Sequence, residues 1–300
     1  MKKRVWVLFG GVLALALAMA GLVANDLLKG DGLVHTEPSE FAPIVVFEEH
    51  GERCMNFNEI EGGGRQTCIQ LNDPEKMVFE YTRLMMSALF VNPEPKNVLI
   101  IGLGGGTLPQ ALHKVLPAAT IDSVEIDPAV VKVAQRYFGY QLGPRQRVFV
   151  EDGRAFVERA LQEGRRYDMV MLDAFDADYI PAHLLTLEFF EQIRGVLSPD
   201  GVVVGNSFAQ SHMYERESAT YAAAFGDFFN LRAGLEGNRV IIATVGELPD
   251  ESEVRRNAAL LAKRLRPFGI DAESIVDAFM VYSQLPGLQT PLRDARPALQ

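Results

Sequence analysis

Short apolar runs alternate with segments of helical spacing between residues 97 and 208. The runs are rich in β-branched residues, as strands are, and they read NVLII, TIDSVE, RVFV, YDMVML and GVVVG. In the segments between them, apolar residues recur three or four positions apart, which is typical of helices that bury one face. Because each helix carries the chain back to the start of the next strand, such units form a parallel sheet with helices on both sides. The sequence therefore predicts an α/β protein with a doubly wound, mainly parallel sheet.

The segments around this core predict further elements. From Pro43 to about Leu71, apolar pairs broken by Glu, Gly and Asn indicate a small antiparallel sheet. Asp73 is placed to cap a helix that Pro74 would begin. Beyond the core we expect a helix near 215–228, two closing strands at 230–235 and 238–246, and a helix at 253–265 before a polar tail. We therefore divide the chain into a tether at 25–42, a small β-domain at 43–72 and a larger domain at 73–300.

The first 24 residues differ from the rest of the chain. Residues 2–4 are basic (KKR), and no charge occurs from Val5 to Ala24. A helix of this length spans roughly 30 Å, the thickness of a bilayer core, and basic residues before it stay in the cytoplasm. Residues 1–24 are expected to be a transmembrane anchor or a cleaved signal segment. We favour the anchor, which predicts a single-pass protein of the inner (plasma) membrane with its soluble domain on the outer (periplasmic) side.

Cys54 and Cys68 are the two cysteines of the chain. They stand in strand-like runs on either side of the turn-rich segment NEIEGGGR, so a hairpin would place them opposite each other. A disulfide and a pair of buried thiols are both compatible with this pattern. An external domain would favour the disulfide, because such bonds persist in oxidising compartments.

The chain is acidic, with a formal net charge of -10 and a pI near 5.1. Basic runs that could neutralise phosphates are short, which argues against a nucleic-acid partner. An acidic site would suit a cationic ligand.

Glycines and acids stand where the predicted strands end. In an open parallel sheet, ligands bind beyond the carboxyl ends of the strands, so these residues are expected to share one site. The glycine turn GLGGGT after the first strand lets a ligand approach the backbone, but Thr107 replaces the glycine that a dinucleotide fingerprint requires. At the ends of the second and third strands, Glu125 could accept hydrogen bonds from ribose hydroxyls, and Asp152 could accept one from an adenine amino group.

This arrangement resembles the nucleoside pocket of enzymes that use S-adenosylmethionine. Ordinary methyltransferases of this fold carry an acid two positions before the first glycine, and here Ile100 stands there. The pattern VLIIGLGGGTL, VEIDP, EDGRAF and YDMVMLDAFD instead resembles the spermidine synthase family over about residues 78–245. The resemblance implies a methyltransferase-like Rossmann fold and pairing of two copies through the small β-domain.

The resemblance also implies roles for individual residues. In this family an Asp-x-x-Asp pair binds a polyamine and removes a proton from its attacking nitrogen, and Asp173 and Asp176 match that pair. The donor would be decarboxylated S-adenosylmethionine, with no metal, and the acceptor a polyamine such as putrescine. Residues expected to bind the donor are Gly102, Gly104, Gly106, Glu125, Asp127, Asp152 and Gly153, and those expected to bind the acceptor are Tyr81, Asp178, Tyr179 and Pro181.

Two positions depart from the family pattern. An aspartate that contacts the donor's amine is replaced by Gly105, and the motif Tyr-x-Glu is replaced by Tyr81, Thr82 and Arg83. Arg83 would suit a carboxylate, such as that of intact S-adenosylmethionine. The sequence thus leaves three functions open, in order of preference: an aminopropyltransferase, a methyltransferase that uses S-adenosylmethionine, and a non-catalytic polyamine or nucleoside binding module.

Overall fold

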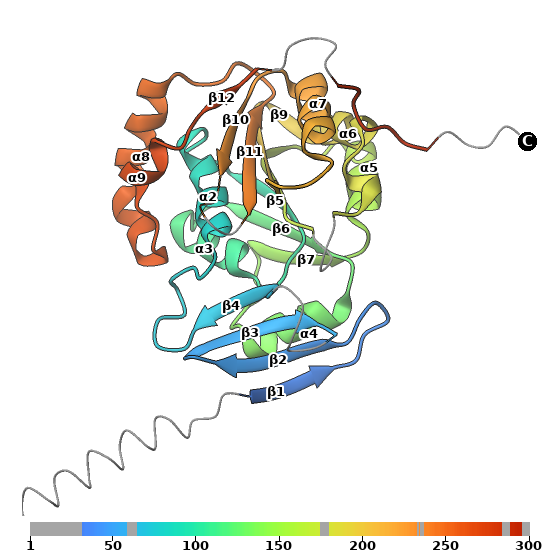
Figure 1. The fold of residues 1–300 in the computed structure, drawn as a ribbon, viewed down its shortest axis with the longest axis vertical. Coiled ribbons are helices and arrows are strands. Elements are labelled where there is room, and N and C mark those ends of the chain that lie inside the picture. The colour runs from blue at the N-terminus through green and yellow to red at the C-terminus, as the bar shows by residue number, and fades with distance from the viewer. Residues whose placement is uncertain are drawn as a thin grey trace, which may run out of the picture.

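The computed structural model describes residues 32–58, 65–174, 180–232, 234, 237–283 and 289–295. Within these residues the chain forms a four-stranded antiparallel sheet and an eight-stranded mixed sheet. The small sheet lies at one end of the large one, as Figure 1 shows. The two sheets confirm the predicted α/β architecture with a small β-sheet before it.

The small sheet has the order β1-β2-β3-β4, and every neighbouring pair is antiparallel. Its strands are β1 (Gly32–Glu37), β2 (Ile44–Glu49), β3 (Glu52–Phe57) and β4 (Thr67–Gln70). Strand β1 lies inside the segment that we interpreted as a tether. Its sequence, GLVHTE, pairs with β2 and so extends the sheet by one strand.

The large sheet has the order β12-β10-β11-β9-β8-β5-β6-β7. Its parallel part consists of β5 (Asn97–Ile101), β6 (Thr120–Glu125), β7 (Gln146–Val150), β8 (Tyr167–Leu172) and β9 (Leu197–Phe208). The antiparallel part consists of β10 (Phe228–Arg232), β11 (Asn238–Thr244) and β12 (Val281–Tyr282). The chain order reverses between β5 and β8, which places a ligand crevice at the carboxyl ends of these two strands.

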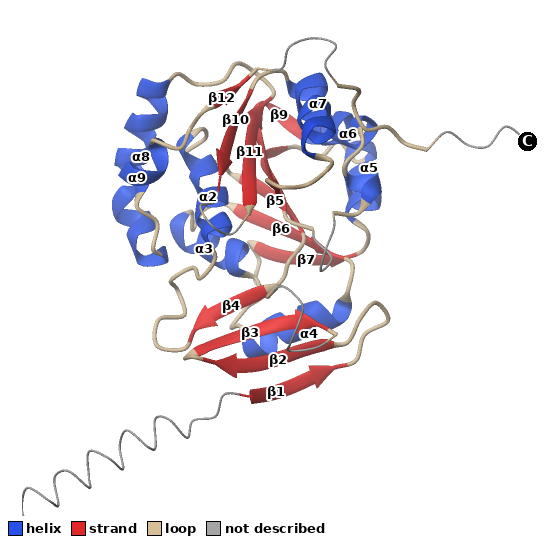
Figure 2. Cartoon of the chain, viewed as in Figure 1, coloured by secondary structure: helices blue, strands red, loops and turns tan. Residues whose placement is uncertain are grey.

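Helices cover both faces of the large sheet (Figure 2). On one face lie α2 (Glu80–Met86), η1 (Ser87–Phe90), α3 (Thr107–Val115), α8 (Glu251–Leu265), η3 (Arg266–Phe268) and α9 (Ala272–Val276). On the other face lie α5 (Gly153–Gln162), η2 (Ala182–Leu184), α6 (Leu187–Val196) and α7 (Tyr214–Phe225). Helix α4 (Pro128–Tyr137) contacts both β2 and β6, so it joins the small sheet to the large one.

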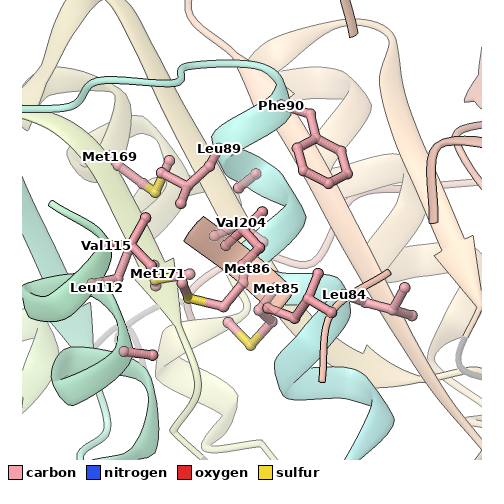
Figure 3. Close-up of a cluster of buried hydrophobic side chains, with 14 of the residues drawn as sticks. Leu84, Met85, Met86, Leu89, Phe90, Leu112, Val115, Met169, Met171 and Val204 are labelled. Carbon is pink, nitrogen blue, oxygen red and sulfur yellow. The ribbon is translucent and has the colours of Figure 1, made fainter. Parts of the chain in front are cut away.

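Strand β8 carries the apolar run MVML because side chains on both of its faces are buried. Met169 and Met171 point into the cluster drawn in Figure 3, where they meet Leu89 and Val204. Val170, between them, points into the cluster on the opposite face of the sheet. Each of these side chains is fully buried, and burial of one such side chain stabilises the fold by about 1.5–3 kcal/mol. The prediction that the central strands are buried on both faces is confirmed.

The helix predicted from Asp73 begins later than expected, at Glu80. The backbone of Met77 is used for other contacts: it forms a bridge with Ile69, and its N–H donates to the carbonyl of Phe268. These contacts hold the chain outside a helical conformation, and Phe79 is extended where the helix begins. The capping signal at Asp73 and Pro74 therefore marks a turn.

The predicted membrane location is contradicted. Among the helices that the structure describes, none is both long and apolar enough to cross a bilayer. A spanning helix needs about 20 consecutive apolar residues, whereas the longest described helix, α8, has 15 residues and several charges. We therefore withdraw the single-pass inner-membrane location with an outer soluble domain. Residues 1–24, on which the anchor prediction was based, lie outside the described residues.

Candidate active site

A cavity of about 720 Å³ lies between the carboxyl ends of the parallel strands and the small sheet. It collects most of the residues that sequence analysis assigned to the site. Those in its lining are Tyr81, Gly102, Gly104, Glu125, Asp127, Asp152, Gly153, Asp173 and Pro181. Gly106 is absent from this lining and instead precedes α3 as its cap residue. Asp176, Asp178 and Tyr179 lie outside the described residues.

The glycine turn is closely packed against the chain after β8. Gly102 has a φ of 97°, in the region that favours glycine. A Cβ atom at this position would lie 2.3 Å from the backbone oxygen of Asp173. Gly102 is therefore required because the backbone of Asp173 packs directly against the glycine turn. This requirement is separate from any contact that the turn makes with a ligand.

Gly105 contacts the small sheet. Its N–H donates a hydrogen bond to the hydroxyl oxygen of Thr67, at 2.9 Å, and Thr67 is the first residue of β4. A Cβ atom at position 105 would lie 2.4 Å from the Thr67 methyl group and 3.1 Å from the Phe138 ring. The space that an aspartate side chain would need at position 105 is therefore filled by neighbouring side chains.

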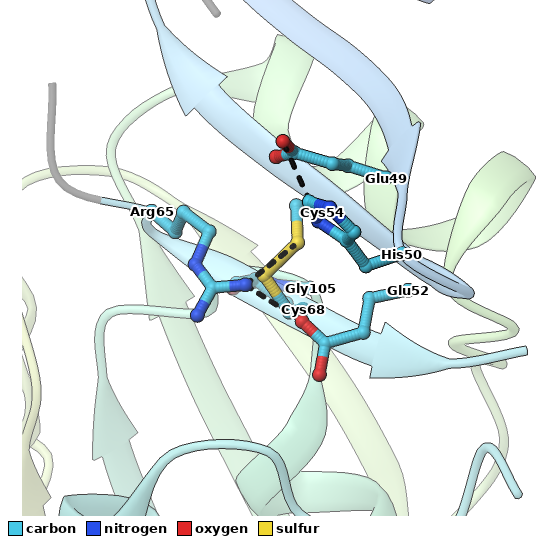
Figure 4. Close-up of a disulfide and its surroundings, with 8 residues drawn as sticks. Glu49, His50, Glu52, Cys54, Arg65, Cys68 and Gly105 are labelled. Atoms are coloured by element: carbon cyan, nitrogen blue, oxygen red, sulfur yellow. Dashed lines mark hydrogen bonds and ion pairs between the residues drawn. A yellow bond between two sulfur atoms is a disulfide. The ribbon is translucent and has the colours of Figure 1, made fainter. Parts of the chain in front are cut away.

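The two cysteines are cross-strand partners on β3 and β4, next to this contact. Cys54 stands opposite Cys68 in the register, and their sulfur atoms are joined in a disulfide (Figure 4). The sequence left open a disulfide or two buried thiols, and the structure contains the disulfide. Because Cys68 follows Thr67 directly, the bond ties the Thr67 end of β4 to β3.

Glu125 ends β6 and accepts hydrogen bonds from the backbone. The N–H of Leu103 donates to one carboxylate oxygen at 2.9 Å, and the N–H of Asp127 donates to the other at 3.1 Å. Burial raises the pKa of Glu125, and these two hydrogen bonds oppose that rise. A carboxylate has about four acceptor sites, so Glu125 retains capacity for ligand hydroxyls.

Asp127 and Asp152 both cap helices. Asp127 accepts from the N–H of Ala129 at 2.8 Å, and it is buried beneath Ser39, whose hydroxyl donates to it at 2.6 Å. Asp127 therefore lies buried in the wall of the cavity, and each of its oxygens accepts one hydrogen bond from the protein.

Asp152 uses one oxygen to cap α5, accepting from the N–H groups of Arg154 and Ala155. Its other oxygen lies 2.8 Å from the ring nitrogen Nε2 of His183. Burial opposes ionisation of Asp152, but the hydrogen bonds from Ala155 and His183 outweigh it and lower its pKa. His183 lines the cavity and was missed by sequence analysis. Its contact with Asp152 joins residues 31 positions apart, so no local pattern indicates it.

Asp173 follows β8 and accepts a hydrogen bond from the side-chain amide of Asn206 at 3.0 Å. Desolvation by burial raises the pKa of Asp173 to about 7, and the hydrogen bond from Asn206 limits the rise. A carboxyl with this pKa can take up a proton near neutral pH, as a general base must. Asn206 was also missed, although an amide inside the apolar run GVVVGNSF was a usable signal, since buried polar side chains need partners.

Arg83 does not line the cavity. Its guanidinium donates to the backbone carbonyls of Met77 and Val78, at 2.7 and 3.1 Å. Arg83 therefore holds the chain before α2, which argues against a role in binding a donor carboxylate.

Comparison with known proteins shows which family the chain is similar to. The spermine/spermidine synthase domain family matches residues 78–231. The polyamine aminopropyltransferase of Vibrio vulnificus is 42% identical over 245 residues, which cover 81% of this chain and 82% of the relative. The chain belongs to the spermine/spermidine synthase family. The resemblance stated from the sequence motifs is thereby confirmed.

Two other comparisons concern the fold and the alternative function. The crystal structure of a spermidine synthase in complex with the transition-state analogue AdoDATO superposes with a TM-score of 0.64 and 20% identity, covering 82% of this chain and 84% of that one. It shows a shared Rossmann-like fold. The eEF1A lysine and N-terminal methyltransferase of Bos taurus is 34% identical over 150 residues, but these cover 45% of this chain and 21% of the relative. The similarity to this methyltransferase therefore covers less of the chain than the similarity to the Vibrio vulnificus aminopropyltransferase.

Proposed function

We propose that this family member is a polyamine aminopropyltransferase, which moves an aminopropyl group from decarboxylated S-adenosylmethionine to a polyamine such as putrescine. The observation that supports this most strongly is that Asp173 lines the same cavity as Glu125 and Asp152. The cavity therefore holds both a carboxylate that can act as base for an amine and carboxylates that can accept hydrogen bonds from a nucleoside. Cavities that bind small molecules are typically about 300–1,000 Å³.

The nucleoside would lie across the ends of β5, β6 and β7. Glu125 has acceptor capacity for the ribose hydroxyls, and Gly102 and Gly104 line the cavity beside it. Asp152 would accept a hydrogen bond from the adenine amino group at the oxygen that now contacts His183. His183 must then turn aside or share that oxygen.

The acceptor amine would bind beside Asp173. A protonated amine has no lone pair for attack, so Asp173 would first bind the cation and then take its proton. The amine nitrogen forms a bond to the carbon next to the sulfonium, the carbon–sulfur bond breaks, and its electron pair neutralises the sulfur. The products are spermidine and methylthioadenosine, and the proton stays on Asp173 until solvent removes it. Asp176 is proposed as the second acid, with Tyr81, Asp178, Tyr179 and Pro181 around the acceptor.

Methyl transfer from S-adenosylmethionine is the second candidate, and one observation favours it. Position 105 has no room for an acid that would pair with the amine of a decarboxylated donor. The engagement of Arg83 by backbone carbonyls argues against it, because that removes the cation expected to pair with the donor's carboxylate.

Offering both donors together with putrescine tests the proposal. Mass spectrometry should detect methylthioadenosine and no S-adenosylhomocysteine. S-adenosylhomocysteine with a methylated amine would instead establish methyl transfer. Calorimetric binding of methylthioadenosine or putrescine without any product would indicate the non-catalytic binding module.

A further inference from the structure

Two asparagines connect Asp173 to the edge strands of the large sheet. The amide nitrogen of Asn206 donates to Oδ1 of Asp173 at 3.0 Å, and the amide nitrogen of Asn238 donates to the amide oxygen of Asn206, also at 3.0 Å. All three side chains line the cavity. The reaction as proposed above assigns no task to either amide.

The backbone ladder between β9 and β11 places the two asparagines together. Asn206 stands opposite Val240, and Asn238 stands opposite Phe208, two residues beyond Asn206. Side chains two apart on a strand share a face, so Asn206 and Asn238 are diagonal neighbours on the same face of the sheet. Asn206 is only 6% exposed, which leaves its amide little access to water as an alternative partner.

The chemistry of the three groups determines the direction of this chain of hydrogen bonds. An ionised carboxylate only accepts, so Asn206 must turn its NH₂ group towards Asp173. Its carbonyl oxygen then faces Asn238, which must donate in turn. If Asn206 rotated by half a turn, two oxygens would face each other at Asp173 and the ionised acid would lose its donor. Among the described residues, no other group donates a side-chain hydrogen bond to Asp173.

We propose that Asn238 is a positioning residue for Asp173, which holds the amide of Asn206 in the orientation that occupies Oδ1 and leaves the second carboxylate oxygen for the substrate amine. This inference rests on the proposed function, in which Asp173 takes a proton from that amine. It assigns to β11 a part in the reaction although no residue of β11 touches the proton.

The variant Asn238→Leu tests this role because it removes the donor and keeps the branched shape and the neutral charge of the side chain. Asn238→Gln retains an amide and is the conservative variant, and Asn238→Ala replaces Asn238→Leu if that protein does not fold. Asn257→Leu is the matched control. Asn257 on α8 donates its amide to the carbonyl of Phe90 at 2.9 Å, away from the cavity.

The first measurement is the titration of the Asp173 carboxyl by ¹³C NMR, with the resonance assigned by its loss in Asp173→Asn. Other titratable groups line the cavity and stay unchanged across the variants; they are Arg65, Tyr81, Glu125, Asp127, Glu151, Asp152 and His183. In Asn238→Leu the pKa of Asp173 should rise by about one unit, the effect of a weakened hydrogen bond to a charged group. Asn238→Gln and Asn257→Leu should titrate as the wild type does.

The second measurement is the pH profile of turnover. In Asn238→Leu the kcat at pH 7 should fall about fivefold, because the ionised fraction of Asp173 drops from about a half to about a tenth, and it should recover at higher pH with KM for the nucleoside donor unchanged. A folded Asn238→Leu or Asn238→Ala protein in which Asp173 titrates as in the wild type would overturn the inference. If the wild type makes no aminopropylated product while the NMR shift is found, the proposed activity fails and the coupling between Asn238 and Asp173 stands.

Discussion

The hydroxyl oxygen of Thr67 accepts a hydrogen bond from the backbone N–H of Gly105, with 2.9 Å between the two atoms. This contact joins β4 of the small sheet to the glycine turn of the large one. Thr67 is buried, and it lines the cavity together with Gly104. The small sheet therefore forms one wall of the candidate active site and supports the turn on which the donor would lie.

Thr67→Val tests this support. Valine keeps the methyl group that fills the space beside Gly105 and replaces the hydroxyl by a second methyl group, so the buried N–H of Gly105 loses its acceptor. We expect a loss of about 1–3 kcal/mol in the free energy of unfolding and a higher KM for the nucleoside donor. Thr67→Ser keeps the hydroxyl and is the control. Denaturant unfolding and initial-rate kinetics give the two quantities. Equal values for the valine and serine variants would show that the Thr67 hydroxyl does not support the glycine turn.

Gly105→Asp introduces the acid that the family resemblance leads us to expect at this position. In this chain its Cβ would meet the Thr67 methyl group and the Phe138 ring, so the variant should lose about 1–3 kcal/mol of stability and gain no affinity for a decarboxylated donor. Combining it with Thr67→Ala makes room for the new side chain. The double variant should be less destabilised than the sum of the two single variants. Strict additivity of the two changes would show that they are not in contact.

The disulfide should stabilise the small sheet. It closes a loop with a sequence separation of 14, for which the chain-entropy estimate is about 3 kcal/mol. A reductant should therefore lower the unfolding midpoint of the wild type and leave that of a Cys54→Ala/Cys68→Ala variant unchanged. Thiol counting in denaturant, without reductant, should find no reactive thiol. An identical response of both proteins to reductant would mean that the bond contributes nothing.

Asp173→Asn should abolish turnover and increase stability. The pKa of Asp173 is raised to about 7 in the folded protein, above the ordinary value of about 3.9 expected in the unfolded chain. Between these two values the folded state binds more protons, so the wild type loses stability as pH rises towards 7. The asparagine variant does not titrate there. It should be more stable than the wild type by about 1–3 kcal/mol at pH 8, with a difference that disappears near pH 4.

The exposed Asp200 provides the control for that comparison. Asp200→Asn removes the same charge from the surface and should change stability little at either pH. A pH-independent difference between Asp173→Asn and the wild type would contradict the raised pKa.

Sequence periodicity was sufficient to predict the central strands, and with them the shared position of Glu125, Asp152 and Asp173. Parallel strands bring their carboxyl ends to one edge, so residues far apart in sequence can be placed together without coordinates. The two closing strands were predicted as well, and they form the antiparallel pair β10 and β11. The helix expected from Asp73 failed because long-range contacts of Met77 override a local capping signal.

The remaining parts of the site depend on tertiary contacts that no local pattern encodes. Thr67 reaches Gly105 across 38 positions, and Asn238 reaches Asn206 across 32. The methyl group of Thr67 also fills the space that a side chain at position 105 would need, and the sequence alone does not reveal this contact. The roles of Asp176, Asp178 and Tyr179 and the division into domains stay predictions.

The most direct measurement of the central claim is a time course of both products from purified protein, putrescine and decarboxylated S-adenosylmethionine. We expect spermidine and methylthioadenosine to accumulate in equal molar amounts, with a rate that rises through pH 7 as Asp173 ionises, and we expect Asp173→Asn to make neither product. Folded wild-type protein that releases no methylthioadenosine under these conditions, or an Asp173→Asn variant that retains the wild-type rate, would contradict it.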